Sequence, residues 1–160
     1  MIDLKKLKDI NLEMKIKRIN GRYIKSLYRL GEHQFKKEFW FTKKFLKDAI
    51  KRKGIYYGAF EGKNLVGAIF VDINDRPKAW LFFFDVKENY RNQGVGKKLL
   101  EVIERKLPKD YYEIFTDCEK ADKLAIKFYK KHGFKKQGKI KDWFGKGTWG
   151  IIYSKTIKEK

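Results

Sequence analysis

The sequence lacks several features that would define a secreted, disulfide-bonded or membrane protein. Its 160 residues include one cysteine, Cys118, which excludes an internal disulfide and a cysteine metal cluster. No apolar run approaches the ~20 residues of a membrane span, and the N-terminal residues lack the apolar core and cleavage site of a secretory signal. Only two prolines occur, and neither a low-complexity linker nor an internal repeat divides the chain. We therefore expect a single cytoplasmic domain over residues 1–160 with no membrane contact.

Acidic residues are scarce relative to basic ones, and the formal net charge is +20. The excess lies toward the two ends of the chain. Residues 1–54 hold 17 basic and 6 acidic side chains and residues 135–160 hold 8 and 2, whereas residues 55–134 hold 15 and 12. Basic flanks favour an anionic partner. Only seven of the 40 basic residues are arginine, and a lysine bias also occurs in thermophilic proteomes, so charge alone does not define the partner.

Hydrophobic periodicity predicts an α/β domain with a mixed sheet. Gly31 is expected to end the first helix, and Pro108 follows the end of the third. The strand at 79–86 is apolar on both faces, which predicts a central position in the sheet. Hairpins are expected first and a strand–turn–helix–strand crossover in the middle. The expected strands are 12–19, 55–60, 65–73, 79–86, 111–117, 134–137 and 148–157, and the expected helices are 23–30, 38–52, 95–107 and 121–132.

A short stretch between the strand at 79–86 and the helix at 95–107 carries the strongest functional signal. Glycines at 94 and 96 allow a tight turn with uncovered amides, and a helix start adds unpaired N–H donors and the positive end of its dipole. Such a turn can bind a phosphate or pyrophosphate, although it can also be a plain tight connection. It lacks the Gly-Lys-Ser/Thr of a P-loop and the glycine spacing of a dinucleotide fingerprint.

Two motifs together resemble a known enzyme family. The first is Arg91-x-x-Gly94-x-Gly96 after a strand that ends in valine, and the second is Ala125-x-x-x-Tyr129-x-x-x-Gly133-Phe134. Over about residues 65–135 they resemble the GNAT family, the Gcn5-related N-acetyltransferases. The resemblance implies a GNAT-like fold, which is a mixed, largely antiparallel sheet with a central strand-turn-helix-strand crossover and flanking helices. It also implies acetyl-CoA as the co-substrate, and no metal.

The resemblance further implies how the donor would be held. The strand ending at Val86 would splay from the next strand, the pantetheine arm would lie in the gap, and the Val86 amide would be the oxyanion donor to the thioester carbonyl. Asp122 stands where many members have an asparagine that contacts the cofactor. An ionised aspartate cannot donate a hydrogen bond, so a helix cap is the alternative role for Asp122. The pyrophosphate would be held by Arg91, Asn92, Gln93, Gly94, Val95 and Gly96, with Lys97 adding charge at the helix start.

The proton transfers are assigned by the same resemblance. Tyr129 matches the tyrosine that protonates the departing CoA thiolate, although a packed core tyrosine is the alternative. Asp117 matches the position of the glutamate base in members similar to the ribosomal-protein N-terminal acetyltransferases. Its side chain is one carbon shorter, so action through a water molecule is expected. Asp85 at the end of the apolar strand is the second candidate base, and a water chain without a dedicated base is the third.

The expected function is acetyl transfer from acetyl-CoA to a primary amine by direct attack. The acceptor is a protein N-terminus, a lysine or a small amine, and the basic flanks favour an anionic context such as an acidic peptide, a ribosomal assembly or an anionic metabolite. The oligomeric state is open between a monomer and a homodimer. The alternative is a GNAT-like module whose basic flanks bind nucleic acid or the ribosome, with little or no transferase activity.

Overall fold

The computed structural model describes residues 14–35, 38, 40–75 and 77–157, and the first two residues of the predicted strand 12–19 lie outside them. Two short 3₁₀ turns, Gly21–Tyr23 and Glu88–Tyr90, precede α1 and the glycine turn. The strands are β1 (Met14–Arg18), β2 (Gly54–Glu61), β3 (Asn64–Asp72), β4 (Lys78–Val86), β5 (Glu113–Glu119), β6 (Lys135–Lys141) and β7 (Trp149–Thr156). The helices are α1 (Ile24–Phe35), α2 (Lys43–Lys51), α3 (Val95–Lys106) and α4 (Lys123–Lys131).

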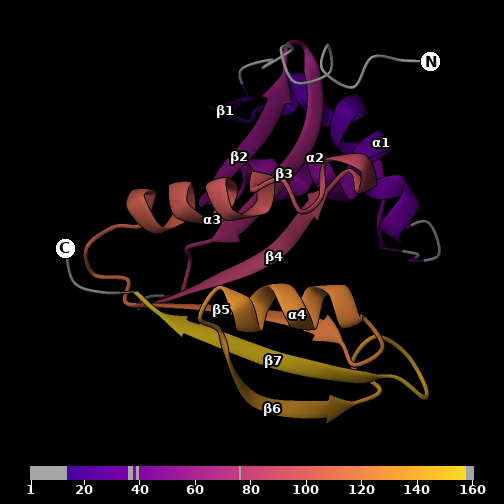
Figure 1. Ribbon diagram of the computed structural model, residues 1–160, viewed down its shortest axis with the longest axis vertical. Helices are drawn as coiled ribbons and strands as arrows, with labels where there is room; N and C mark the ends of the chain where they lie inside the picture. Colours follow the sequence, from indigo (N-terminus) through magenta and orange to yellow (C-terminus); the bar gives the residue numbers. More distant parts are fainter. Residues whose placement is uncertain (1–13, 36–37, 39, 76, 158–160) are drawn as a thin grey trace, which may run out of the picture.

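The described strands form one sheet in the order β1-β2-β3-β4-β5-β7-β6. Adjacent strands in this sheet are antiparallel except β4 and β5. These two run parallel because the chain crosses over between them through α3. The predicted mixed, largely antiparallel sheet with its central crossover is therefore confirmed, and β4 lies in the middle as expected. Figure 1 shows α3 and α4 in front of the sheet, with α1 and α2 behind its upper part.

Each layer of helices covers its own hydrophobic core. Leu99 and Ile103 of α3 pack with Tyr129 of α4 on one face, and Leu27 of α1 packs with Leu46 of α2 on the other. In both cases the helix buries one apolar stripe and exposes its charged residues. Within the described ranges, no helix is both long enough and apolar enough to span a bilayer.

Two predicted helix boundaries were wrong, because tertiary contacts override local signals. α1 continues through Gly31 to Phe35, and a Cβ at Gly31 would lie 2.4 Å from the Phe41 ring. Gly31 therefore allows close packing and does not end the helix. α2 starts at Lys43, later than the predicted residue 38, because the Thr42 hydroxyl accepts the Phe45 amide as an N-cap. β6 extends to Lys141, beyond the predicted 134–137.

β4 carries a bulge close to the point where its pairing with β5 ends. Phe70 of β3 pairs with Phe83, but Val71 pairs with Leu81, so Phe82 is the extra residue. The parallel pairing of β4 with β5 covers only Lys78–Leu81 against Glu113–Thr116. Beyond that point the strands diverge, and Figure 1 shows β4 rising away from β5. The splay that the resemblance implied is thus present, and its vertex lies at Leu81.

Candidate active site

The open edge of β4 provides backbone groups for an extended ligand. Lys87 donates its amide to Val66 of β3, and the ladder alternates, so every second residue of β4 bonds β3. The amides of Phe84 and Val86 fall between these bonds and point to the splayed side. A chain that contains amides can pair with this edge as an added strand would.

The turn after β4 is built to leave amides uncovered. Asn92 and Gly94 adopt left-handed backbone angles, with φ of 60° and 81°, and Gly94 stands at the N-cap of α3. The first bond inside α3 runs from the Lys98 amide to the Gly94 carbonyl, so the amides of residues 95–97 precede the helical ladder. A Cβ at Gly96 would lie 3.0 Å from the Phe128 ring. The turn therefore fits a pyrophosphate, and the open β4 edge fits the amide-bearing arm of acetyl-CoA.

Arg91 ties this turn to the end of β4. Its Nε donates to the Val86 carbonyl at 2.9 Å, and its Nη2 lies 3.5 Å from the Asp85 carboxylate. The Arg91 side chain is 38% exposed, whereas that of Asp85 is 4% exposed. Burial raises the pKa of Asp85 to about 7, because the attraction of the partly hydrated Arg91 and the Val86 amide offsets only part of the desolvation. Asp122 raises this pKa slightly further.

Tyr129 places its hydroxyl close to the vertex of the splay. It is buried on the α4 face of the sheet, and the Thr116 hydroxyl lies 3.5 Å from its oxygen. Thr116 in turn donates to the Leu81 carbonyl at 3.0 Å, across the last paired residues of β4 and β5. Burial raises the pKa of Tyr129 well above its usual value, so the phenol keeps its proton at neutral pH.

Asp117 lies just beyond the vertex on β5, on the face opposite Tyr129. Thr116 and Cys118 point to the α4 face, and alternation turns the half-buried Asp117 side chain to the other face. The indole Nε1 of Trp143 donates to Asp117 Oδ2 at 2.5 Å. Burial raises the pKa of Asp117, and this hydrogen bond opposes the rise.

Asp122 forms the N-cap of α4, where its carboxylate accepts the Ala125 amide at 3.0 Å. This is the alternative role that the sequence offered. Burial raises the pKa of the Cys118 thiol to about 12, and the negative charges of Asp122 and Asp117 contribute to the rise. The thiol therefore stays protonated at neutral pH and is a packing residue.

The structure adds three groups that sequence reasoning missed. The Phe84 amide could have been found only by knowing the phase of the β3–β4 ladder. Thr116 directly precedes Asp117, but nothing in the sequence indicates that its hydroxyl meets Tyr129. Trp143 is 26 residues from Asp117, in the segment between the last two predicted strands, and nothing in the sequence connects the two residues.

The fold and the site can now be compared with known proteins. The sequence model of the Acetyltransferase (GNAT) family matches residues 22–134. The chain therefore belongs to the GNAT acetyltransferase family, as its two motifs predicted. Membership makes it an acetyltransferase that uses acetyl-CoA as co-substrate and an amine as acceptor.

One curated relative and two solved structures illustrate what this chain is similar to. Spermine/spermidine N(1)-acetyltransferase of Bacillus subtilis (strain 168) is 29% identical over 109 residues, which cover 62% of this chain and 72% of that protein. The structure of Ard1 from Thermoplasma volcanium has a TM-score of 0.80 at 20% identity and covers 91% of this chain and 99% of its own. PaiA N-acetyltransferase from Thermoplasma acidophilum, solved with coenzyme A, has a TM-score of 0.71 at 21% identity, with 90% and 99% covered. At these identities the two structures show the shared fold.

Proposed function

We propose that this protein transfers an acetyl group directly from acetyl-CoA to a primary aliphatic amine, with Asp117 as base and Tyr129 as acid. The main support is one arrangement. A protonated, buried phenol approaches the splay from the α4 face, and a carboxylate approaches it from the other face. The β4 amides that point away from β3 lie beside them. This arrangement suits an acetyl carbon that is attacked from one side while its sulfur leaves toward the other.

The proposed donor arm runs along β4 from the glycine turn toward the vertex. Tyr129 can reach only a sulfur near the vertex, because its hydroxyl neighbours Thr116. The Phe84 amide is nearer to that point than the Val86 amide, by one two-residue repeat of the strand. The Val86 amide also faces the Asp85 carboxylate closely enough to lower its pKa, which disfavours an oxyanion there. We therefore assign the acetyl oxygen to the Phe84 amide and the arm to the Val86 amide.

Asp117 is the better base of the two carboxylates. Asp85 has a pKa of about 7, which suits proton transfer, but its side chain is 4% exposed and held by Arg91. Its place at the end of β4 suits a clamp on the turn. Asp117 is half-buried next to the vertex, and only one of its oxygens receives the Trp143 hydrogen bond.

In the proposed step the acceptor nitrogen bonds to the acetyl carbon, and the bond from that carbon to sulfur breaks. One N–H proton passes to Asp117, and the Tyr129 hydroxyl gives its proton to sulfur. Asp117 then releases its proton to solvent, and Tyr129 regains a proton from solvent. The products are the N-acetyl amine and the free thiol of CoA.

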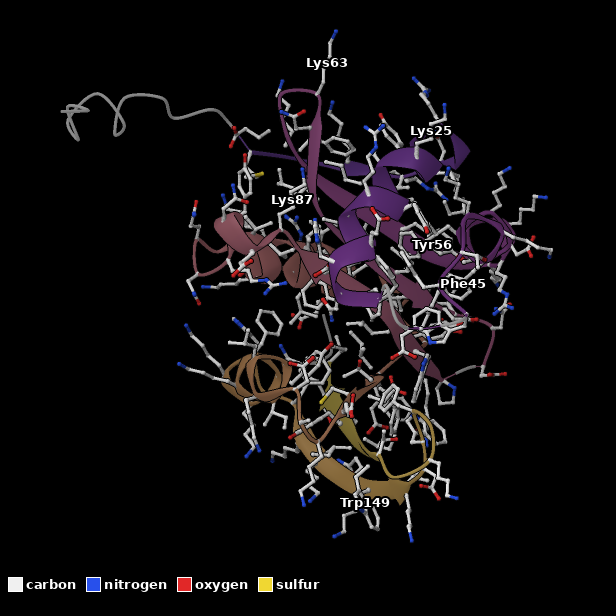
Figure 2. The ribbon with its side chains drawn as sticks, turned by 90° about the vertical axis from the view of Figure 1, so that its right-hand side faces the viewer. Lys25, Phe45, Tyr56, Lys63, Lys87 and Trp149 are labelled. Atoms are coloured by element: carbon white, nitrogen blue, oxygen red, sulfur yellow. The ribbon has the colours of Figure 1, made fainter. Side chains whose placement is uncertain are left out.

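For the acceptor we propose a small amine that carries a second positive charge. Three carboxylates lie near the splay, those of Asp85 at the end of β4, Asp117 on β5 and Asp122 at the start of α4, while Arg91 is engaged at the turn. A polyamine acceptor, as in the name of the Bacillus relative, fits this local charge. This departs from the anionic context expected from the basic flanks. That context keeps one supporting observation, the lysines such as Lys25 and Lys63 that project around the outline in Figure 2.

The test is thiol release from acetyl-CoA with a panel of amines that includes spermidine, a monoamine of similar length and a peptide with an acidic N-terminal region. We expect kcat/KM to be highest for spermidine. A higher value for the acidic peptide would refute the cationic acceptor and favour the anionic one. Asp117→Asn should lower kcat by about 10²-fold or more, and Asp85→Asn by much less. Equal losses in both variants would contradict the assignment of the base.

A second candidate function is binding of RNA through the basic surface. The observation that favours it is the edge strand β6, where four lysines are exposed. The same lysines also prevent edge-to-edge pairing of sheets, which is a common reason for lysine at an edge. Binding of RNA with a steep salt dependence, together with no calorimetric signal for acetyl-CoA, would favour this function over catalysis.

A further inference from the structure

The loop between β6 and β7 is held in one shape by its own hydrogen bonds. The Asp142 carboxylate accepts the Gly147 amide at 2.7 Å, and the Thr148 hydroxyl accepts the Phe144 amide at 3.1 Å and donates to the Gly145 carbonyl at 2.7 Å. Asp142, Gly145 and Gly147 all have positive φ. These internal hydrogen bonds hold the loop backbone in one conformation, so its side chains have fixed orientations.

Trp143 projects from this loop onto the face of β7 beside Asp117. A Cβ at Gly150 would lie 2.5 Å from the Trp143 Cδ1 atom, so the ring lies directly on the Gly150 backbone. Gly150 pairs with Glu119, two residues beyond Asp117 on β5. The missing side chain at position 150 thus leaves the space that lets the indole reach Asp117 Oδ2.

We propose that Trp143 is a positioning residue that holds the Asp117 carboxylate in orientation for proton transfer, and that Gly150 makes room for it. This rests on the proposed role of Asp117 as base. The indole N–H donates a hydrogen bond to Oδ2 of Asp117, which fixes the plane of the carboxylate. Oδ1 is then left to receive the proton of the acceptor amine. A tryptophan nitrogen only donates, so the bond favours the ionised carboxylate, which is the form that acts as base.

Other charged groups near Asp117 do not replace this support. The Asp117 charge acts through the sheet on Tyr129 of α4 and Cys118 of β5, which lie on the opposite face, and both keep their protons more firmly because of it. Asp122 at the start of α4 adds negative charge to both of these groups. On β7, the residue paired with Asp117 is the apolar Ile152. The indole N–H and the backbone amide of Asp117 itself favour the charged form, and of these two groups only the indole comes from another residue.

The experiment measures kcat/KM against pH with the best amine of the panel, for the wild type and for Trp143→Phe. Phenylalanine keeps an aromatic ring on Gly150 but removes the N–H. We expect the acidic limb of the profile to move up by about one pH unit and kcat to fall by about tenfold, with KM for acetyl-CoA unchanged. Trp149→Phe is the matched control. Trp149 lies at the lower edge of Figure 2, where its ring contacts Lys139, and its profile should equal that of the wild type.

Gly150→Ala gives an independent second variant, which keeps the indole but pushes it from its place. It should move the acidic limb in the same direction as Trp143→Phe. The proposal is overturned if Asp117→Asn loses activity while Trp143→Phe and Gly150→Ala both keep the wild-type pH profile. It is also overturned if Asp117→Asn retains full activity, but acetyl transfer itself then stands, because thiol release continues. Absence of thiol release by the wild type with every amine would count against the proposed function instead.

Discussion

The buried carboxyl of Asp85 should make the protein less stable as the pH rises through neutrality. Its pKa is about 7 in the folded chain and near 3.8 in the unfolded chain. Between these values the folded state binds more protons than the unfolded state, so the free energy of unfolding falls with increasing pH. The full shift of about three pKa units corresponds to about 4 kcal/mol, of which about 2–3 kcal/mol falls between pH 5 and pH 8.

Asp85→Asn isolates this effect, because asparagine fills the same space without a titratable proton. The other shifted groups, such as Asp117, remain in both proteins and cancel in the difference. Loss of the Arg91 partner adds only an offset that does not vary with pH, since arginine stays charged. We therefore expect the variant to gain about 2–3 kcal/mol relative to the wild type between pH 5 and pH 8.

Urea unfolding followed by tryptophan fluorescence at pH 5, 6, 7 and 8 measures this difference. A difference that stays constant with pH would show that the desolvation of Asp85 does not govern its pKa. A wild type that gains stability relative to the variant would show that Arg91 lowers the pKa of Asp85 below its usual value. Either result would refute the reasoning.

Three further variants test other parts of the structure. Tyr129→Phe should lower kcat by about 10²-fold. The free energy of unfolding should change by less than about 1 kcal/mol, because the lost hydroxyl makes one long contact, with Thr116. An unchanged thiol-release rate would remove Tyr129 from the mechanism. Gly31→Ala should destabilise by about 1–3 kcal/mol in thermal unfolding, because its methyl would overlap the Phe41 ring. Gly94→Ala, at a φ of 81°, should cost about 1 kcal/mol and raise KM for acetyl-CoA, and an unchanged KM would contradict the role of the turn.

The local features of the fold were predictable because they depend on neighbouring residues. Apolar runs of strand length indicated β2 and β3, and the period of the apolar residues indicated α3 and α4. Gly94 and Gly133 flank the predicted helices 95–107 and 121–132, and both have positive φ in the structure. The first two helices were predicted less well. Glycine is a common helix terminator, which is why Gly31 was expected to end the first helix. In the structure Gly31 lies inside α1, where the Phe41 ring leaves no space for a Cβ atom.

The sequence by itself determined the order of the elements, the glycine turn with its uncovered amides and the family to which the chain belongs. These follow from backbone sterics and from short motifs, which act over a few residues. Only the tertiary structure decided how the groups of the site meet. The bulge at Phe82 fixes which β4 amides face the splay, burial raises the pKa of Asp85, and Trp143 reaches Asp117 across 26 residues of chain. These contacts depend on the register of the strands and on which side chains are buried together. Neither can be read from the identity of the residues that make the contact.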